Sequence, residues 1–262
     1  PLSIDEAFLD VTCNKPQILL AQDIAREIKE AIRQETELTA SAGVSYNKFL
    51  AKIASDYRKP DGLFTIHPDR ALDFIATLPI EDFWGVGPKT RETMHRMGIF
   101  NGEQLRQCSL KHLTEVFGKA GPTFYNFARG IDERPVENVR IRKSEDCDLT
   151  FLEDINKRSA ILIDQCRTVM DLLTRREKSG FRGLTLSLKI KYSDFTNITR
   201  SITSDRVLTK KQDILPLAKE LLRQVDTTTK PIRLIGLSVS NPCDDKKRPQ
   251  WVEQELHFKE WD

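Results

Sequence analysis

The sequence lacks the features that mark several large classes of protein. No apolar run approaches the roughly 20 residues that a membrane-spanning helix needs. Its five cysteines form no C-x-x-C pair and its four histidines show no ligand spacing, so a structural zinc site does not fit. This composition excludes a membrane-spanning protein and fits a protein of the reducing cytoplasm that contacts no membrane.

A strong excess of one charge is also missing, since the formal net charge is only +2. The balance differs between the halves of the chain. Residues 1–133 hold 16 Lys and Arg against 19 Asp and Glu, whereas residues 134–262 hold 25 against 20. A basic face can neutralise phosphates even when acids elsewhere keep the total near zero. The composition is therefore compatible with a polyanionic partner without requiring one.

The first part of the chain has the pattern of an α/β layer. Residues 7–12 alternate like a half-buried strand, 17–35 carry apolar residues at helical spacing, 38–45 form a small-residue strand and 47–56 a second helix. This order predicts helices packed on a sheet. With 262 residues in all, the chain is long enough for further domains after this layer.

The middle of the chain, residues 69–131, carries no convincing strand pattern. Short amphipathic segments are separated by glycines, and GPKTRETMHRMGI at 87–99 is loosely repeated by GPTFYNFARGI at 121–131. We expect a small all-helical unit, which an internal duplication would explain. The charged segment 132–143 that follows is expected to be a linker.

The last part has the order β-α-β-β-α-β, which packs two helices on one face of four strands. In LTLSLKIKY at 184–192 apolar and polar residues alternate, so Lys189 and Lys191 face away from the helices. The predicted fold class is a multi-domain α+β protein whose last sheet has one polar, cationic face. The expected elements are strands at 144–152, 183–193, 197–208 and 231–240 and helices at 155–178 and 211–225.

Two acidic residues, Asp5 and Glu6, stand side by side before the first expected strand. Side chains alternate along an extended chain, so both can serve one site only where the chain bends. The segment SIDE at 3–6 is compatible with a turn, and adjacent carboxylates suit Mg²⁺, which takes one or two of them and lets substrate phosphates complete its octahedron. Taken alone, such a pair is more often a solvated surface turn.

A glycine hairpin follows at Gly85-Val86-Gly87, directly before Pro88 at a favoured first helical position. The exposed amides at the start of the next helix can hold a phosphate of a nucleic-acid strand without reading a base. Lys89 adds positive charge. The arrangement resembles a helix-hairpin-helix, a module for sequence-independent DNA contact. The alternative is a plain αα-hairpin with a glycine turn.

Lysines cluster in and just after the second expected helix. Lys48 and Lys52 lie four residues apart on one helix face, and Lys59 stands at the helix exit, where a loop could direct it at a triphosphate. The spacing alone favours the simpler interpretation, a solvated face with a C-terminal cap.

Six motifs occur in a fixed order along the chain: SIDEAFLDVT, TASAGVSYNKFLAKIASDYRKPDG, GVGPKT, FGKAG, GIDERPV and RIRKS. Together they resemble the Y-family translesion DNA polymerases, in particular the DinB or DNA polymerase IV branch, over nearly all of residues 1–240. The resemblance implies nucleotide addition opposite damaged or ordinary template bases by two-metal in-line displacement. It also implies the later part of a palm at 1–67, a thumb at 68–131, a little finger at 144–241 and a tail at 242–262.

The resemblance implies roles for single residues. Asp5 and Glu6 correspond to paired carboxylates that bind Mg²⁺ near the primer 3′ hydroxyl, and Lys59 to a lysine that contacts the incoming deoxynucleoside triphosphate. The hairpin at 85–87 matches the thumb turn that holds the primer backbone. The further contacts expected with primer-template DNA are Lys52, Lys89, Arg142, Lys143, Lys189, Lys191 and Arg200.

Family members begin with a strand that carries D-x-D-x-F-F, which supplies another metal-binding carboxylate, and fingers follow it. Neither precedes Asp5 here, so we expect a C-terminal fragment that binds primer-template DNA weakly and does not polymerise. The tail WVEQELHFKEWD at 251–262 loosely resembles a sliding-clamp peptide, with a frayed terminus as the alternative. We expect a monomer.

Two other functions stay open. A non-catalytic DNA-binding module would use the hairpin and the basic sheet merely to hold a duplex, and replacing Asp5 would not affect it. A structural α+β protein with no nucleic-acid role would behave independently of salt, whereas phosphate neutralisation makes affinity fall steeply with salt.

Overall fold

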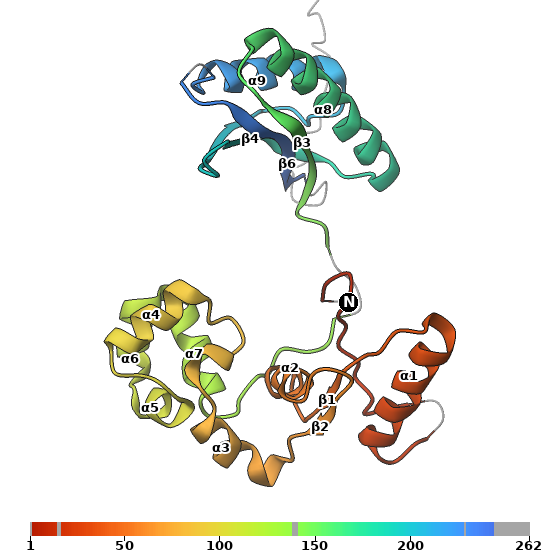
Figure 1. Cartoon of the computed structure of the whole chain (residues 1–262), viewed down its shortest axis with the longest axis vertical. Coiled ribbons are helices and arrows are strands. Elements are labelled where there is room, and N and C mark those ends of the chain that lie inside the picture. Colours follow the sequence, from red (N-terminus) through yellow and green to blue (C-terminus); the bar gives the residue numbers. More distant parts are fainter. Residues whose placement is uncertain (1, 15–16, 138–140, 228, 244–262) are drawn as a thin grey trace, which may run out of the picture. The chain divides into compact units, whose positions relative to one another are not determined.

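The computed structural model describes residues 2–14, 17–137, 141–227 and 229–243. The chain forms two compact units, Pro1–Val139 and Arg140–Asp262 (Figure 1). No helix among the described residues combines the length and apolar character needed to cross a membrane.

The first unit begins with two helices and two short strands. Strands β1 and β2 pair in parallel, with Gly43 opposite Phe64, and Asn47 caps the second helix by accepting a hydrogen bond from the Leu50 amide at 2.9 Å. The helices confirm the two that the apolar spacing predicts. The elements are α1 (Ala21–Thr36), β1 (Ala42–Val44), α2 (Lys48–Tyr57) and β2 (Leu63–Thr65).

The strands of this unit differ from the prediction. Residues 7–12 form no strand, although their pattern alternates, because a strand needs a neighbouring ladder and β1 pairs with β2. The expected strand at 38–45 shortens to β1. Strand β2 was not predicted, since three residues are too few for a periodic signal.

The rest of the first unit is helical, as predicted. Its buried residues form one hydrophobic cluster with those of α2. The Phe49 ring of α2 stacks on Phe127 with centroids 4.0 Å apart and lies 5.5 Å from the Phe83 centroid. The α/β part and the helical part of the first unit therefore share one core. The helical elements are α3 (Pro68–Thr77), η1 (Ile80–Asp82), α4 (Pro88–Arg96), α5 (Gly102–Gln107), α6 (Leu110–Phe117), η2 (Gly118–Ala120) and α7 (Gly121–Phe127).

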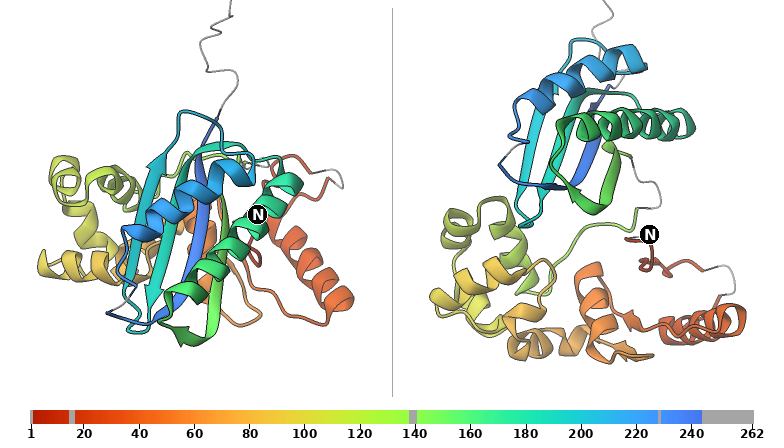
Figure 2. Two further views of the ribbon diagram at one scale, coloured as in Figure 1. Left: turned by 90° about the horizontal axis from the view of Figure 1, so that it is seen from above. Right: turned by 45° about the horizontal axis from the view of Figure 1, so that its top comes forward.

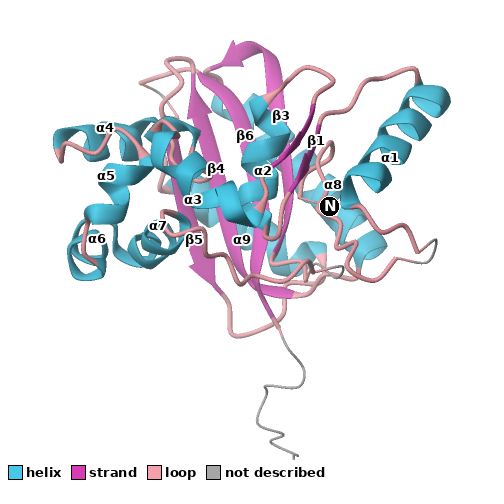
Figure 3. Ribbon diagram, turned by 90° about the horizontal axis from the view of Figure 1, so that it is seen from below, coloured by secondary structure: helices cyan, strands magenta, loops and turns pink. Residues whose placement is uncertain are grey.

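The second unit has the predicted β-α-β-β-α-β order. Its four strands are antiparallel in the order β3-β6-β4-β5, the long arrows of Figure 3. Helices α8 and α9 contact each other and cover one face of the sheet (Figure 2). The elements are β3 (Ser144–Ile155), α8 (Arg158–Ser179), β4 (Gly183–Tyr192), β5 (Asn197–Thr203), α9 (Lys211–Arg223) and β6 (Ile232–Pro242).

Burial along β4 follows the predicted alternation. Leu186, Leu188 and Ile190 are fully buried under the helices, whereas Lys189 on the other side is exposed. We call the helix-free side of this sheet the open face. Strand β5 ends earlier than predicted, because the chain after Thr203 turns back toward the start of β4.

Candidate catalytic and nucleic-acid-binding site

The acidic pair lies at a bend of the chain. The amides of Leu2 and Ser3 donate to the Glu6 carbonyl at 2.7 and 3.2 Å, so the backbone reverses direction around Asp5. The Ser3 hydroxyl donates to Asp5 Oδ1 at 2.6 Å and fixes this carboxylate in the turn. The bend that the two carboxylates require to serve one site is therefore present.

A row of ion pairs connects this turn with α2. Lys52 Nζ lies 2.7 Å from Glu6 Oε1 and 3.0 Å from Asp56 Oδ2, and Lys59 Nζ lies 2.6 Å from the other oxygen of Asp56. Lys52 and Asp56 lie side by side because residues four apart share one face of a helix. We call Asp5, Glu6, Lys52, Asp56 and Lys59 the acidic corner.

The charges of this corner reinforce one another. The pKa of Asp5 is lowered by the Ser3 hydroxyl and by the positive charges of Lys59 and Lys52, so this carboxylate is ionised at neutral pH. Burial opposes ionisation of Asp56, but hydrogen bonds from Lys59 and Lys52 lower its pKa. Burial likewise opposes the charge of Lys52, but Glu6 and Asp56 raise its pKa.

Two of these placements were not foreseen. Lys52, predicted as a DNA contact, has only 18% of its side chain exposed and holds Glu6. Asp56 was not singled out, although its position four residues after Lys52 and three before Lys59 is the signal that could have identified it. Lys59 is half exposed at the helix exit, as its position after α2 predicts.

Helix α2 is held in place by a buried carboxylate. The side chain of Asp132 is 2% exposed. It accepts a hydrogen bond from the Phe49 amide at 3.0 Å and two more from the Arg134 guanidinium at 2.6 and 2.7 Å. Burial opposes its charge, but the Arg134 contacts keep the pKa of Asp132 low. A carboxylate at the start of a helix also suits the helix dipole.

Replacing Asp132 by Ala is expected to destabilise the first unit by about 1–3 kcal/mol, because it leaves the Phe49 amide and Arg134 without their acceptor. The stabilisation from the lowered pKa of Asp132 is present above the ordinary value of 3.8 and is lost as pH falls. The free energy of unfolding should therefore fall less between pH 7 and pH 3 in the variant than in the unchanged chain. Urea unfolding at pH 7 and pH 3 measures both effects. The exposed neighbour Glu133→Ala serves as control, and equal losses in both variants would contradict the assignment.

Aromatic rings connect the acidic corner with the glycine hairpin. Phe8 lies just after the acidic pair and meets Trp84 at 5.6 Å between centroids, and Trp84 stacks on Phe127 at 6.4 Å. Lys48 Nζ lies 5.7 Å over the Phe8 ring. These contacts lie within the first unit and tie the segment after Glu6 to the residue that precedes Gly85.

The hairpin itself has the geometry that its glycines predict. Gly85 has a φ of +89°, a region that favours glycine, and the Val86 amide donates to the Phe83 carbonyl at 3.0 Å. Gly87 precedes α4, whose first turn contains no acidic residue. Lys89 is exposed in that turn. The start of α4 therefore offers free amides and a positive charge to an anion.

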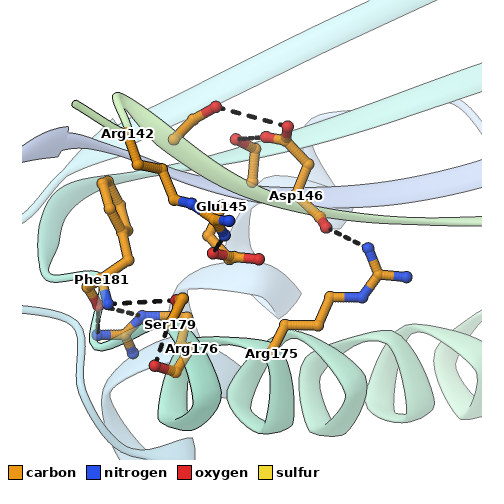
Figure 4. A network of polar contacts seen from close by, with 9 residues as sticks. Arg142, Glu145, Asp146, Arg175, Arg176, Ser179 and Phe181 are labelled. Atoms are coloured by element: carbon orange, nitrogen blue, oxygen red, sulfur yellow. Dashed lines mark hydrogen bonds and ion pairs between the residues drawn. The ribbon is translucent and has the colours of Figure 1, made fainter. Parts of the chain in front are cut away.

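The basic residues before β3 differ in their contacts. Arg142 forms an ion pair with Glu145, whose side chain is 8% exposed (Figure 4). In the same network Arg175 donates to the Asp146 carbonyl at 2.9 Å. Lys143 is exposed. Arg142 thus fixes the start of β3, whatever contact it makes with DNA.

Hydroxyl pairs and one ion pair cover the open face of the second unit. Thr185 bonds Thr203 at 3.0 Å, and a serine pair follows on the same two strands. Lys189 Nζ reaches across β6 to Asp148 Oδ2 at 2.8 Å, a path that Gly236 keeps clear because a Cβ there would lie 2.0 Å from the Asp148 carboxylate. The open face is polar, and part of its positive charge is neutralised.

Arg200 does not lie on this open face. It stands opposite Leu188, and residues directly opposite each other in a sheet share a face. Its neighbours two residues away, Ile198 and Ile202, pack against the core under the helices. Arg200, expected as a DNA contact, therefore lies on the helix side of the sheet, whereas Lys189 lies on the open face.

Two open cavities, of about 480 and 530 Å³, lie elsewhere on the molecule. The first is lined by residues 11–14 and 17–19 with Ala21 and Ser45, and the second by residues of α8 and α9. None of the predicted site residues contributes to either one. Among the described residues, no group of three or more His, Cys, Asp or Glu is arranged to hold a metal ion. The acidic corner and the hairpin are surface sites open to a large ligand.

Models of known families match three parts of the chain. A model of the impB/mucB/samB family matches residues 1–56, the DNA polymerase-iota thumb domain matches 81–132, and the impB/mucB/samB family C-terminal domain matches 142–251. A protein of Bacteroides fragilis described as DNA polymerase IV is 59% identical over 263 aligned residues, covering 100% of this chain and 72% of that protein. The chain belongs to the DNA polymerase IV branch of the Y family.

Other relatives agree with this membership. DNA polymerase IV of Akkermansia muciniphila is 56% identical over 259 aligned residues and covers 99% of the chain and 72% of that protein. Among solved structures, a Y-family DNA polymerase chimera of Dbh and Dpo4 has a TM-score of 0.76 at 25% identity, over 84% of this chain and 64% of that one. The chain thus spans a little under two thirds of the solved polymerase.

These similarities confirm the predicted family, the α+β class and the enzyme class that the family names, DNA polymerase. The roles of single residues stay predictions, as do the boundaries of palm, thumb and little finger. The tail at 251–262 lies outside the described residues.

Proposed function

We propose that the protein to which these residues belong is a DNA-directed DNA polymerase that extends primers across ordinary and damaged template bases. The observation that carries the proposal is the acidic corner, where Lys52 pairs with Glu6 and the positive charges of Lys59 and Lys52 help to lower the pKa of Asp5. Membership of the DNA polymerase IV branch supports it. So does the fold, which is similar to one solved as an insertion ternary complex of Dbh DNA polymerase, at 23% identity and a TM-score of 0.54.

The donors of the acidic corner fit a divalent cation with hard oxygen ligands. Asp5 is exposed and its pKa is lowered, and Glu6 is partly exposed, so both offer carboxylate oxygens to a metal. Mg²⁺ takes one or two protein carboxylates and completes its shell with water and phosphate oxygens. When bound, it would neutralise charge on the transferred phosphate. We propose Asp5 and Glu6 as its ligands in this chain.

The lysines then divide between two tasks. Lys52 forms ion pairs with both Glu6 and Asp56, and we propose that it positions Glu6. Lys59 is more exposed than Lys52 and pairs with Asp56 Oδ1, so its ammonium can exchange this partner for a triphosphate oxygen. Asp56 restrains both lysines and keeps them on one side of α2.

DNA contact is proposed for two surfaces, one in each unit. The first is the hairpin Gly85-Val86-Gly87 with Lys89, where amides at the start of α4 can hold a backbone phosphate. The second is the open face with Lys189 and Lys191. Both bind phosphates without reading bases, as an enzyme that copies any sequence requires.

Replacing Asp148 by Asn is expected to raise DNA affinity, because it releases Lys189 for a phosphate and removes a repulsive carboxylate. One additional phosphate contact should steepen the slope of log affinity against log salt by about 0.9. Fluorescence anisotropy with a labelled primed hairpin over a salt series measures this. Asp205→Asn, an equal charge change at an exposed position after β5, is the control.

Binding that does not depend on salt in the unchanged chain would contradict the proposed function. An equal response of Asp148→Asn and Asp205→Asn would contradict only the assignment of the open face, since both variants change net charge alike.

The proposal also covers the substrates, the oligomeric state, the location and the C-terminal segment. We propose deoxynucleoside triphosphates and primer-template DNA as substrates, a monomer in the cytoplasm, and the segment 251–262 as a sliding-clamp peptide. That the 262-residue chain alone binds DNA without extending a primer stays a prediction.

A further inference from the structure

The turn between β4 and β5 presents an exposed aromatic ring. Phe195 is 59% exposed and has a φ of +64°, a backbone conformation that bulky residues rarely adopt. An apolar ring in such a position contributes little to the core of the unit. Strained backbone conformations that persist are common at binding sites.

Two cations lie against this ring. Lys191 Nζ lies 5.3 Å from the ring centroid, and the Arg233 guanidinium carbon lies 5.0 Å from it. Arg233 also lies 3.8 Å from Asp154, which limits where its guanidinium can point. Lys191 projects toward the open face, since it continues the alternation of Lys189. The ring is therefore part of a cationic surface.

The turn is fixed by its own hydrogen bonds. Asp194 accepts bonds from the amide and the hydroxyl of Thr196 at 3.0 and 2.6 Å and pairs with Lys230 at 2.6 Å. The Lys230 and Thr196 contacts hold the pKa of Asp194 well below its usual range, so this carboxylate is ionised at neutral pH. The Phe195 amide donates to the Tyr192 carbonyl at 2.9 Å. The turn is therefore already ordered, and binding at the Phe195 ring does not incur the entropy cost of ordering a mobile loop.

We propose that Phe195 stacks on an unpaired nucleobase of single-stranded DNA, with Lys191 and Arg233 beside the adjoining phosphates. The inference rests on the proposed DNA-binding function and adds to it a site for a strand that is not in a duplex. Base stacking on an aromatic side chain is independent of sequence, because every base has a π-face. Bases inside a duplex are already stacked on their neighbours and do not offer that face.

Charge favours a nucleic-acid strand over other ligands for an aromatic ring. The flanking lysine and arginine repel a cationic ligand such as a quaternary ammonium group. They attract the phosphate that accompanies each base. A neutral apolar partner would leave both cations without compensation, since Asp154 lies near only one of them.

The test compares single-stranded, blunt duplex and overhang-bearing DNA on the 262-residue chain by fluorescence anisotropy. Phe195→Ala is expected to weaken single-strand binding roughly tenfold and to leave blunt-duplex affinity unchanged. Phe195→Trp should retain the affinity, and its fluorescence should be quenched on binding. Leu152→Ala, a change at another exposed apolar side chain, serves as control for folding and general surface effects.

Different measurements test the stacking site and the proposed function. Equal single-strand affinity of Phe195→Ala and the unchanged chain overturns the stacking site. Absence of salt-dependent duplex binding in the unchanged chain counts against the proposed function instead. A loss that is equal for blunt duplex and single strand also overturns the inference, because it removes the preference for unpaired bases.

Discussion

Replacing Asp5 by Asn in the intact gene product is expected to lower the rate of primer extension about a hundredfold or more. The amide keeps the size of the side chain and can still receive the Ser3 hydroxyl at its oxygen, but it lacks the charge that a divalent cation requires. Loss of metal-based charge stabilisation in the transition state removes several kcal/mol from catalysis. Single-turnover extension of a labelled primer measures the change.

The control for this experiment is Asp10→Asn. Asp10 is also exposed, and its pKa is also lowered by a hydroxyl, that of Thr12, followed by the Thr12 amide. It lies outside the acidic corner, so its replacement should leave extension unchanged. Primer-template affinity should be the same in both variants. Retained extension in Asp5→Asn would favour a non-catalytic DNA-binding module.

The lowered pKa of Asp5 also predicts the pH dependence of extension. A carboxylate whose pKa lies below its ordinary value of 3.8 is fully ionised from about pH 5 upward. Protonation of Asp5 therefore does not limit the rate between pH 5 and pH 8. A rate that falls as pH drops from 7 to 6 would indicate a different titrating group.

The sequence indicated which residues belong to the candidate site better than it indicated the contacts between them. The pair Asp5 and Glu6 and the bend they require were predictable, because adjacency and alternation are local properties. The contact of Lys52 with Glu6 joins residues 46 positions apart, and no local pattern encodes such a pairing. Asp56 was missed for a different reason: its local spacing to Lys52 and Lys59 is present in the sequence, but a carboxylate between two lysines is typical of a solvated helix face.

The fold was predictable where elements are long and periodic. Helices α1 and α2 and the order of the second unit follow from apolar spacing over ten or more residues. The segment 7–12 alternates as a strand does, but pairing depends on a neighbour that its own sequence does not specify. Arg200 lies on the helix side together with Ile198 and Ile202, a placement that the alternation of its own strand already indicates.

Replacing Gly43 by Ala is expected to destabilise the first unit strongly, because an added methyl group has no room beside α2. A Cβ at this position would lie 2.1 Å from the Ala51 carbonyl oxygen and 2.2 Å from the Ser55 amide nitrogen, both in the backbone of α2. Backbone atoms cannot rotate away as side chains do, so α2 must move away from β1. Overpacking of this kind costs about 3 kcal/mol.

The displacement acts on the acidic corner, because α2 carries Lys52 and Asp56 and the lysine holds Glu6. Gly43→Ala should therefore lower the melting temperature of the first unit by roughly 10 °C. In the intact gene product it should also reduce primer extension at temperatures where the unit is still folded. Gly87→Ala is the control for stability, since its φ is −83° and nothing lies within 4 Å of an added Cβ. Unchanged melting of Gly43→Ala in differential scanning calorimetry would mean that β1 and α2 do not approach so closely. It would then contradict the proposed effect of β1 on the position of Glu6.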